Sequence, residues 1–102
     1  MTEKQKLPTE YLEMMAEAIR VLGHGQRLQI LEYLDLHGES SVGDIVAGVG
    51  GRQGAVSQHL NKMRLAGILS CRRDSRQVYY AIAAESPVTI LNCLRRRFES
   101  GC

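Results

Sequence analysis

The sequence predicts a mainly α-helical fold with one small β-hairpin, and three observations support that prediction. Apolar residues recur at helical spacing in about five segments, which glycines and prolines separate from one another. Two apolar runs, at residues 68–71 and 78–82, flank a polar loop as the strands of a hairpin do. Residues 52–80 carry six Lys or Arg against one Asp, whereas residues 1–51 carry four against eight acidic residues. The predicted hairpin and the helix before it therefore form one basic unit.

Apolar periodicity predicts the first two helices. Thr9 is suited to cap a helix at residues 10–22, whose apolar stripe is wider than a small core requires. A second helix is predicted at residues 26–36, and Gly38 then provides a C-terminal stop. The residues of this second helix that we expect to face the core are Leu28, Ile30, Leu31 and Leu34.

The next two segments have the pattern of a helix-turn-helix. Ser41 and Asp44 stand three residues apart, as in a capping box, at the start of a short helix at residues 42–48. Glycines then predict a tight turn, and a longer helix follows at residues 53–66 and ends at Gly67. Its predicted core residues are Val56, Leu60, Met63 and Leu65. Two short helices joined by a glycine-containing turn are the arrangement of a helix-turn-helix.

The hairpin and one further helix complete a winged helix-turn-helix. Residues 72–77 form the predicted loop of the hairpin, which is the wing. Ser86 is suited to cap the last helix, with Pro87 at its first position, where the missing N–H costs nothing. A small winged helix cannot cover the apolar faces of both terminal helices, so we expect a homodimer through them. The predicted interface residues are Leu12, Met15, Ile19, Leu91, Leu94 and Phe98.

The helix at residues 53–66 and the hairpin carry the side chains that a duplex-binding surface needs. Residues near the start of the second helix of a helix-turn-helix reach base edges, and Gln and Ser are base-reading side chains. We therefore assign base contacts to Gln53, Ser57 and Gln58. Phosphate or minor-groove contacts are assigned to Arg52, Lys62, Arg72, Arg73 and Arg76. The alternative is that these side chains form the solvated faces of a helix and a charged hairpin. For His59, in the same helix, a phosphate contact and a packing or hydrogen-bonding role within the fold both stay open.

Composition argues against several other function classes. One Phe and no Trp provide no platform for stacking single-stranded bases, and no apolar run is long enough to span a membrane. The chain has no paired nucleophile and base, so we predict neither an enzyme nor a cofactor. Three widely spaced cysteines and a polar first segment favour the cytoplasm. We predict a disordered tail at residues 1–8 and one domain at residues 9–102.

Four segments in the same order and spacing resemble the ArsR/SmtB family of small dimeric winged-helix repressors. They read RLQILEYL, SVGDIV, QGAVSQHLNKMRLAGIL and RRDSRQVYYAI, and the resemblance covers residues 11–98. It implies that the helix at residues 53–66 enters the major groove, that the terminal helices form the dimer, and that an inducer releases the DNA. The resemblance thus favours a sequence-specific repressor of double-stranded DNA. The alternative is a winged-helix module that docks protein or RNA.

The sequence does not identify the inducer. Metal-sensing relatives place Cys around the short helix or Asp and His on the last helix, but here residues 39–44 have no thiol and residues 86–99 have neither Asp nor His. We therefore predict no metal site. In a persulfide-sensing branch, two reactive Cys align with Glu32 and Glu99, which are not nucleophiles for that chemistry. The remaining candidate thiol sensors are Cys71, Cys93 and Cys102. The alternative is that Cys71 and Cys93 are small buried hydrophobic residues and that Cys102 is a terminal residue without a role.

Overall fold

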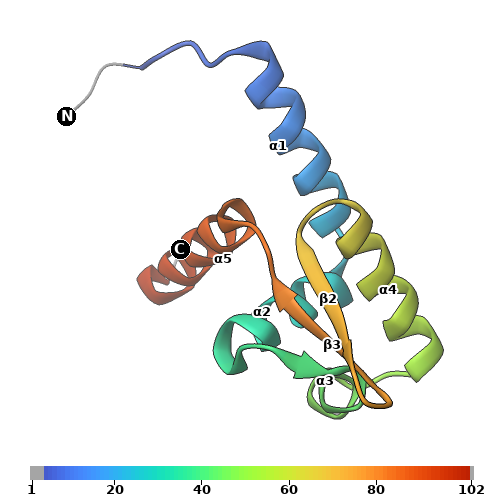
Figure 1. Ribbon diagram of the computed structural model, residues 1–102. Coiled ribbons are helices and arrows are strands. Elements are labelled where there is room, and N and C mark those ends of the chain that lie inside the picture. The colour runs from blue at the N-terminus through green and yellow to red at the C-terminus, as the bar shows by residue number, and fades with distance from the viewer. Residues whose placement is uncertain (1–3, 102) are drawn as a thin grey trace.

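The computed structural model describes residues 4–101 of the chain. Within these residues it has five helices around a small antiparallel sheet (Figure 1), which confirms the mainly α-helical class and the winged helix-turn-helix. No helix in this part of the chain combines the length and the apolar composition needed to cross a membrane. The element bounds are α1 Thr9–Leu22, α2 Gly25–His37, β1 Ser40–Ser41, α3 Val42–Val49, α4 Gln53–Leu65, β2 Leu69–Asp74, β3 Gln77–Ile82 and α5 Glu85–Ser100.

Residues 1–3 and Cys102 lie outside the described residues. Residues 4–8 are exposed and belong to no helix or strand. The division into a disordered tail and one domain at residues 9–102 stays a prediction.

Two of the three predicted serine and threonine caps are wrong. The side chain of Ser41 accepts a hydrogen bond from the backbone N–H of Asp44 at 3.1 Å and caps α3 as predicted. In contrast, α1 includes Thr9 and has Pro8 at its cap, while α5 begins at Glu85, one residue before Ser86. Pro87 is therefore the third residue of α5, where its backbone N–H would still have no partner inside the helix.

The core lies where α2, α3 and α4 meet one face of the sheet. Its fully buried side chains are Ile30, Leu31, Ile45, Val56, Leu60 and Met63. Leu65 was predicted to join them, but it is 70% exposed. Residues two positions apart on an α-helix point about 200° apart, so an inward Met63 places Leu65 outward.

The turn between α3 and α4 is fastened to α2. Gly50 and Gly51 have φ values of 80° and 93°, which residues with a side chain rarely adopt. The side-chain amide of Gln26 donates a hydrogen bond to the carbonyl of Gly50 at 3.2 Å. A Cβ on Gly51 would lie only 2.6 Å from that amide nitrogen, so glycine also provides the space for this contact. The start of α4 is therefore held in a fixed position relative to α2.

The sheet has a strand that the sequence did not predict. Its order is β1-β3-β2, and Ser40 and Ser41 of β1 pair with Tyr80 and Tyr79 of β3. The two strands of the hairpin are also longer than predicted, because only Ser75 and Arg76 remain between them as the turn. The wing is thus a continuous two-stranded ribbon almost to its tip.

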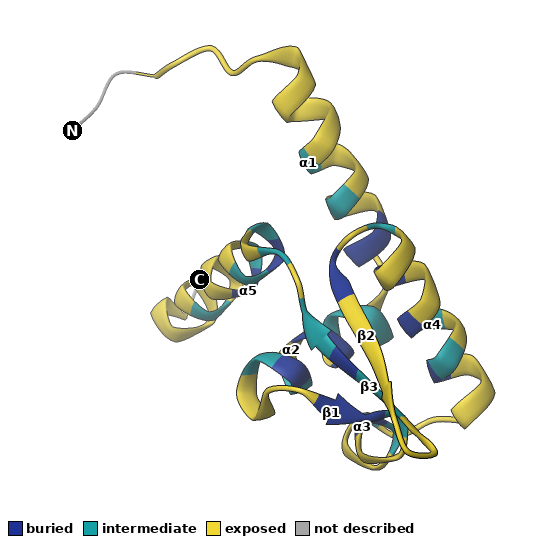
Figure 2. Cartoon of the chain, viewed as in Figure 1, coloured by how far each residue is buried: buried dark blue, intermediate teal, exposed yellow. Residues whose placement is uncertain are grey.

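Each terminal helix contributes only a few residues to the core. The first part of α1 stands clear of the other elements, and α5 lies on the opposite side of the view (Figure 1). Burial follows the same division, since α1 contributes only Val21 and Leu22 to the buried residues (Figure 2).

Candidate nucleic-acid interface

The polar side of α4 is free of contacts with the rest of the fold at its start. Gln53 and Gln58 are exposed, and Ser57 is half-buried on the flank of the same helix. Arg52, at the N-cap position, has an exposed side chain that makes no capping hydrogen bond, and the first turn contains no acidic residue. The positive end of the helix dipole is therefore uncompensated within α4, which favours the approach of an anion such as a phosphate.

The wing presents two of its three predicted arginines without an internal partner. Arg73 and Arg76 are exposed, and neither makes an ion pair with another described residue. Both side chains extend from a ribbon whose β2 strand is exposed along its length after Leu69 (Figure 2). This arrangement provides exposed and unpaired positive charge at the wing, which suits a phosphate contact.

Arg72 differs from the other two wing arginines. Its guanidinium donates hydrogen bonds of 2.8 and 2.9 Å to the two carboxylate oxygens of Glu39. It also lies 3.6 Å from the carboxylate of Asp74 and 4.9 Å from the centre of the Tyr79 ring. The pair lowers the pKa of Glu39 and raises that of Arg72. Arg72 therefore joins the wing to the segment before β1, and its charge is largely neutralised by partners within the same chain.

A cluster of three basic side chains joins α4 to the start of α2. The Arg27 guanidinium donates hydrogen bonds of 3.1 Å to His59 Nδ1 and of 3.1 Å to the carbonyl of Val21. The His59 ring lies 4.4 Å from that of His24, whose own Nδ1 accepts from the backbone N–H of Gln26 and caps α2. Burial lowers the pKa of His59, and the positive charges around it lower the pKa further. His59 therefore has a packing and hydrogen-bonding role here.

Arg27 is a residue that sequence analysis missed. It is half-buried and connects the end of α1 with α4, so it helps to fix the orientation of the helix that carries Gln53 and Gln58. Nothing in the spacing of residues in α2 distinguishes it from an ordinary solvated arginine, since its acceptors lie in other elements.

Arg95 differs from its neighbours Arg96 and Arg97, because it is paired within the fold. Arg95 is half-buried and pairs with Asp35 at 2.7 Å, which joins α5 to α2. Only Arg96 and Arg97 are exposed. This pair was not predictable from sequence, because 60 residues separate its two members.

The predicted dimer residues divide into exposed and buried groups. Leu12, Ile19, Leu94 and Phe98 are exposed, with Phe98 the most at 86%, and Met15 is half-buried. Leu91 is only 7% exposed because it packs in the core of its own chain. Leu91 is therefore a core residue of the single chain, whereas the other five leave apolar surface open on α1 and α5.

The two described thiols are both exposed, which argues against the alternative that they are small buried hydrophobes. Cys71 lies opposite Tyr80 in the wing, and Cys93 lies on α5. Cys102 lies outside the described residues. Within residues 4–101, no three His, Cys, Asp or Glu side chains are grouped in a way that could hold a metal ion.

Glu32 and Glu99, which align with the two cysteines of the persulfide-sensing branch, line the same hollow. This hollow of about 360 Å³ lies between α2 and α5, and its other lining residues are Leu91, Leu94, Arg95 and Phe98. The fold thus brings the two aligned positions together, with carboxylates where that branch has thiols.

Comparison with known proteins identifies the family. The family model described as bacterial regulatory protein, arsR family, matches residues 24–70. The nodulation protein NolR of Rhizobium meliloti is 36% identical over 93 residues, which are 88% of this chain and 75% of that protein. A biofilm growth-associated repressor of Agrobacterium fabrum is 34% identical over 80 residues, which are 78% of this chain and 68% of that protein.

A solved structure agrees with the sequence comparisons. The homodimeric winged helix-turn-helix DNA-binding domain Mb0332 of Mycobacterium bovis superposes with a TM-score of 0.75. It is 26% identical, and the match covers 97% of this chain and 91% of that one. The chain therefore belongs to the arsR family of bacterial regulatory proteins.

Proposed function

We propose that this protein is a sequence-specific repressor that binds double-stranded DNA in the cytoplasm as a homodimer and is released by an inducer. The observation that carries the proposal is the placement of α4 and the wing. The start of α4 and the turn of the wing lie at the same end of the molecule (Figure 1), and exposed Gln and Arg side chains occupy both. A duplex can therefore meet the base-reading helix and the cationic ribbon together.

The side chains have different roles in this proposal. Gln53, Ser57 and Gln58 read base edges in the major groove, because amide and hydroxyl groups can pair with them. The exposed cations that contact phosphates are Arg52, Arg73 and Arg76, which fix the register without reading sequence. Lys62, which the sequence also assigns to a phosphate, is exposed but lies in the last turn of α4, away from the start of the helix, so we leave it out of this set. Arg72 contributes through its support of the wing. A dimer has two copies of these base-reading and phosphate-contacting residues, related by two-fold symmetry. An operator with two half-sites related by the same symmetry would therefore contact both subunits alike.

Release by an inducer is inferred from membership of the family and from the exposed thiols. Cys71 lies in the wing between Ser70 and Arg72 on a fully exposed stretch of β2, so a modification there would change the DNA-contacting ribbon directly. Cys93 lies on α5, near the apolar surface that we assign to the dimer. These positions support the candidacy of both thiols as sensors.

Alanine substitution of Gln58 tests the assignment of base readout. A bidentate contact with the correct base contributes about 1–3 kcal/mol, so Gln58→Ala should weaken binding to the selected operator by about 5- to 150-fold for each half-site that loses the contact. Binding to random DNA should change little, because that binding depends on phosphates. The measurement is fluorescence anisotropy at one salt concentration, with an operator selected from a random-sequence pool.

Gln29→Ala is the matched control, because Gln29 is an exposed glutamine on α2 away from the proposed interface. It should leave both affinities unchanged. If Gln58→Ala weakens binding equally on operator and random DNA, the residue does not read bases. If no operator emerges from the selection and duplex binding is weak at low salt, the alternative of a protein- or RNA-docking module gains support.

A further inference from the structure

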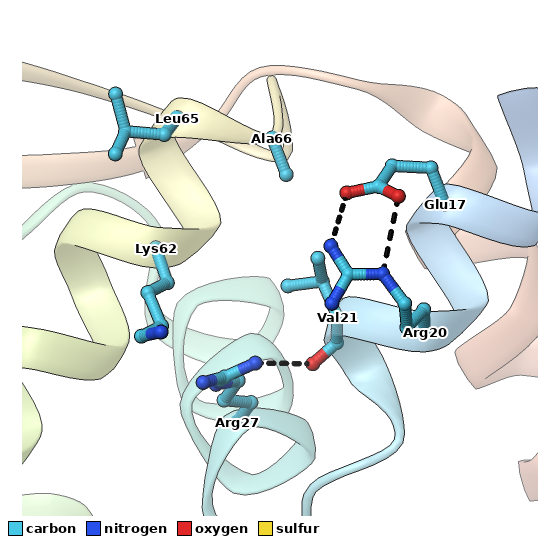
Figure 3. A pocket seen from close by; sticks show the side chains of 7 residues that line it. All are labelled: Glu17, Arg20, Val21, Arg27, Lys62, Leu65 and Ala66. Atoms are coloured by element: carbon cyan, nitrogen blue, oxygen red, sulfur yellow. Dashed lines mark hydrogen bonds and ion pairs between the residues drawn. The ribbon is translucent and has the colours of Figure 1, made fainter.

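A second cationic site lies away from the start of α4. The C-terminal part of α4, the end of α1 and the start of α2 line an open hollow of about 280 Å³ (Figure 3). This volume is close to the lower end of the range for small-molecule sites. The side chains that line the hollow are Glu17, Arg20, Val21, Arg27, Lys62, Leu65 and Ala66.

Two of the three cations in this hollow have no carboxylate partner. Arg20 is neutralised by Glu17, to which it makes two hydrogen bonds. Arg27 donates only to the uncharged acceptors His59 and Val21, and Lys62 makes no ion pair among residues 4–101. The hollow therefore keeps a local charge of about +2 after the internal pair is subtracted, which is a field that attracts anions.

The orientation of the two free cations fits a shared ligand. Lys62 descends from α4 and Arg27 rises from α2, so their charged groups face one another across the hollow (Figure 3). Arg27 is held in place by its bonds to two other elements, so its guanidinium is oriented before any ligand arrives. A fixed guanidinium beside a flexible ammonium is well suited to a carboxylate or phosphate group.

We propose that this hollow binds a small anionic metabolite through a phosphate or carboxylate group held between Lys62 and Arg27. The ligand would connect α4 with α1 and α2 at one point. Any effect of this ligand on operator binding rests on the function proposed above. The binding site itself does not, because it is formed by the free protein.

A DNA phosphate has the same chemistry, but the position of the hollow favours a free anion. Lys62 lies near the end of α4, whereas the proposed base-reading residues begin at Gln53. On that helix, Lys62 lies on the flank that carries His59 and faces α1 and α2. The site thus opens between helices of the scaffold, apart from the wing.

The probe is inorganic phosphate, titrated at constant ionic strength into ¹⁵N-labelled protein without DNA. We expect saturable shifts of the Arg27 side-chain N–H and of the backbone signals around Lys62. The pKa of His59 should rise when phosphate binds, because the added negative charge offsets the two cations beside it. Lys62→Gln should raise the phosphate dissociation constant about tenfold or more, and Lys62→Arg should largely retain binding.

Arg64→Gln is the control, because it removes the same charge from the same helix but from an exposed residue that does not line the hollow. It should leave phosphate binding unchanged. Shifts that do not saturate, or that are equal in the Lys62→Gln and Arg64→Gln proteins, would overturn the site.

The source of the anion is tested by repeating the titration on the complex with DNA. Retained phosphate binding supports a free metabolite as the ligand. Exclusion of phosphate by DNA, together with weaker DNA binding by the Lys62→Gln protein, would show that the DNA backbone occupies the hollow, and would overturn the proposed ligand class. Exclusion without that loss of DNA affinity would mean that a free anion and DNA compete through coupling between two sites, and supports the proposal. If the protein binds phosphate but no specific DNA, the anion site is confirmed and only the repressor proposal fails.

Discussion

At the scale of single residues, the burial of His59 makes the stability of the protein depend on pH. Its Nδ1 accepts a hydrogen bond from Arg27, and an imidazole that gains a proton there loses this acceptor. The ring is half-buried and faces the His24 ring and the Arg27 guanidinium from α2, with Lys62 on its own helix. Burial and this positive surrounding lower the pKa of His59 below its ordinary value of 6.5. The structure therefore favours a neutral His59 at pH 7.

His59 should make the protein less stable as the pH falls below neutral. Between its lowered folded pKa and the unfolded value of 6.5, the unfolded chain binds more protons, so the free energy of unfolding rises with pH. This contribution is complete above 6.5 and decreases as the pH falls from there. Urea denaturation between pH 5 and 8 measures it, and His59→Gln, which keeps an acceptor without a titrating ring, should flatten the curve.

His37→Gln provides the comparison for this pH dependence. His37 is exposed and its ring lies 4.3 Å from that of Tyr33, so His37→Gln removes a histidine that takes no part in the contact between Arg27 and His59. The carboxyl groups of Glu17 and Glu39, with pKa values lowered from 4.5, contribute at lower pH than the histidine. Equal slopes in the wild-type and His59→Gln proteins would contradict the assignment.

At the scale of elements, local sequence signals were sufficient to predict the helices but not the contacts between elements. The capping serine Ser41 and the glycine-rich turn act within a few residues, so the helix-turn-helix was predictable from sequence. The strand β1 consists of two serines and has no apolar alternation, because it exists only through its pairing with β3. The same reason explains why Arg27 was missed and why Arg72 was assigned to DNA without its partner Glu39.

The wing offers a test of this difference between free and paired arginines. Each phosphate contact contributes about 0.9 to the slope of log K against log salt concentration. Arg73→Gln should therefore reduce the slope by about 2 in a dimer, because Arg73 is free in each wing. Arg72→Gln should change the slope little, because Glu39 and Asp74 already neutralise that side chain. Binding titrations on random DNA at four salt concentrations provide both slopes.

The stability of the Arg72→Gln and Arg73→Gln proteins further separates an arginine paired within the fold from one that contacts DNA. The pair between Arg72 and Glu39 is exposed on both sides, so its loss should change the free energy of unfolding only slightly. A reduction of the slope by Arg72→Gln as large as that by Arg73→Gln would mean that Arg72 leaves Glu39 and contacts DNA.

At the scale of the whole molecule, charge and apolar surface lie on different parts of the fold. The net positive charge of residues 52–80 lies on α4 and the wing, whereas most of the exposed large apolar side chains lie on α1 and α5, with Leu36 and Leu65 among the exceptions. The sequence predicted this division, because apolar residues at helical spacing exceeded what a core of this size can bury. It did not predict that Leu91 belongs to the core, since periodicity identifies a face and not its partner.

The apolar surface of α5 should be necessary for the dimer. Phe98 is 86% exposed and Leu94 is 46% exposed, so a second copy of the chain is the natural cover for both. Burial of a Phe side chain contributes about 1.5–3 kcal/mol, and a two-fold interface contains two of them. Phe98→Asp should therefore weaken the dimer by about a hundredfold or more. Sedimentation equilibrium across a range of protein concentrations measures this change.

Leu36→Asp is the matched substitution, because Leu36 is 65% exposed on α2 and lies outside the predicted interface. It introduces the same charge on a helix surface and should leave the dimer mass unchanged. Circular dichroism should show equal helix content in both variants, because Phe98 takes no part in the core of its own chain. If the Phe98→Asp protein remains a dimer at the lowest concentrations where the wild type is one, α5 does not form the interface, and the apolar face of α1 would have to form it alone.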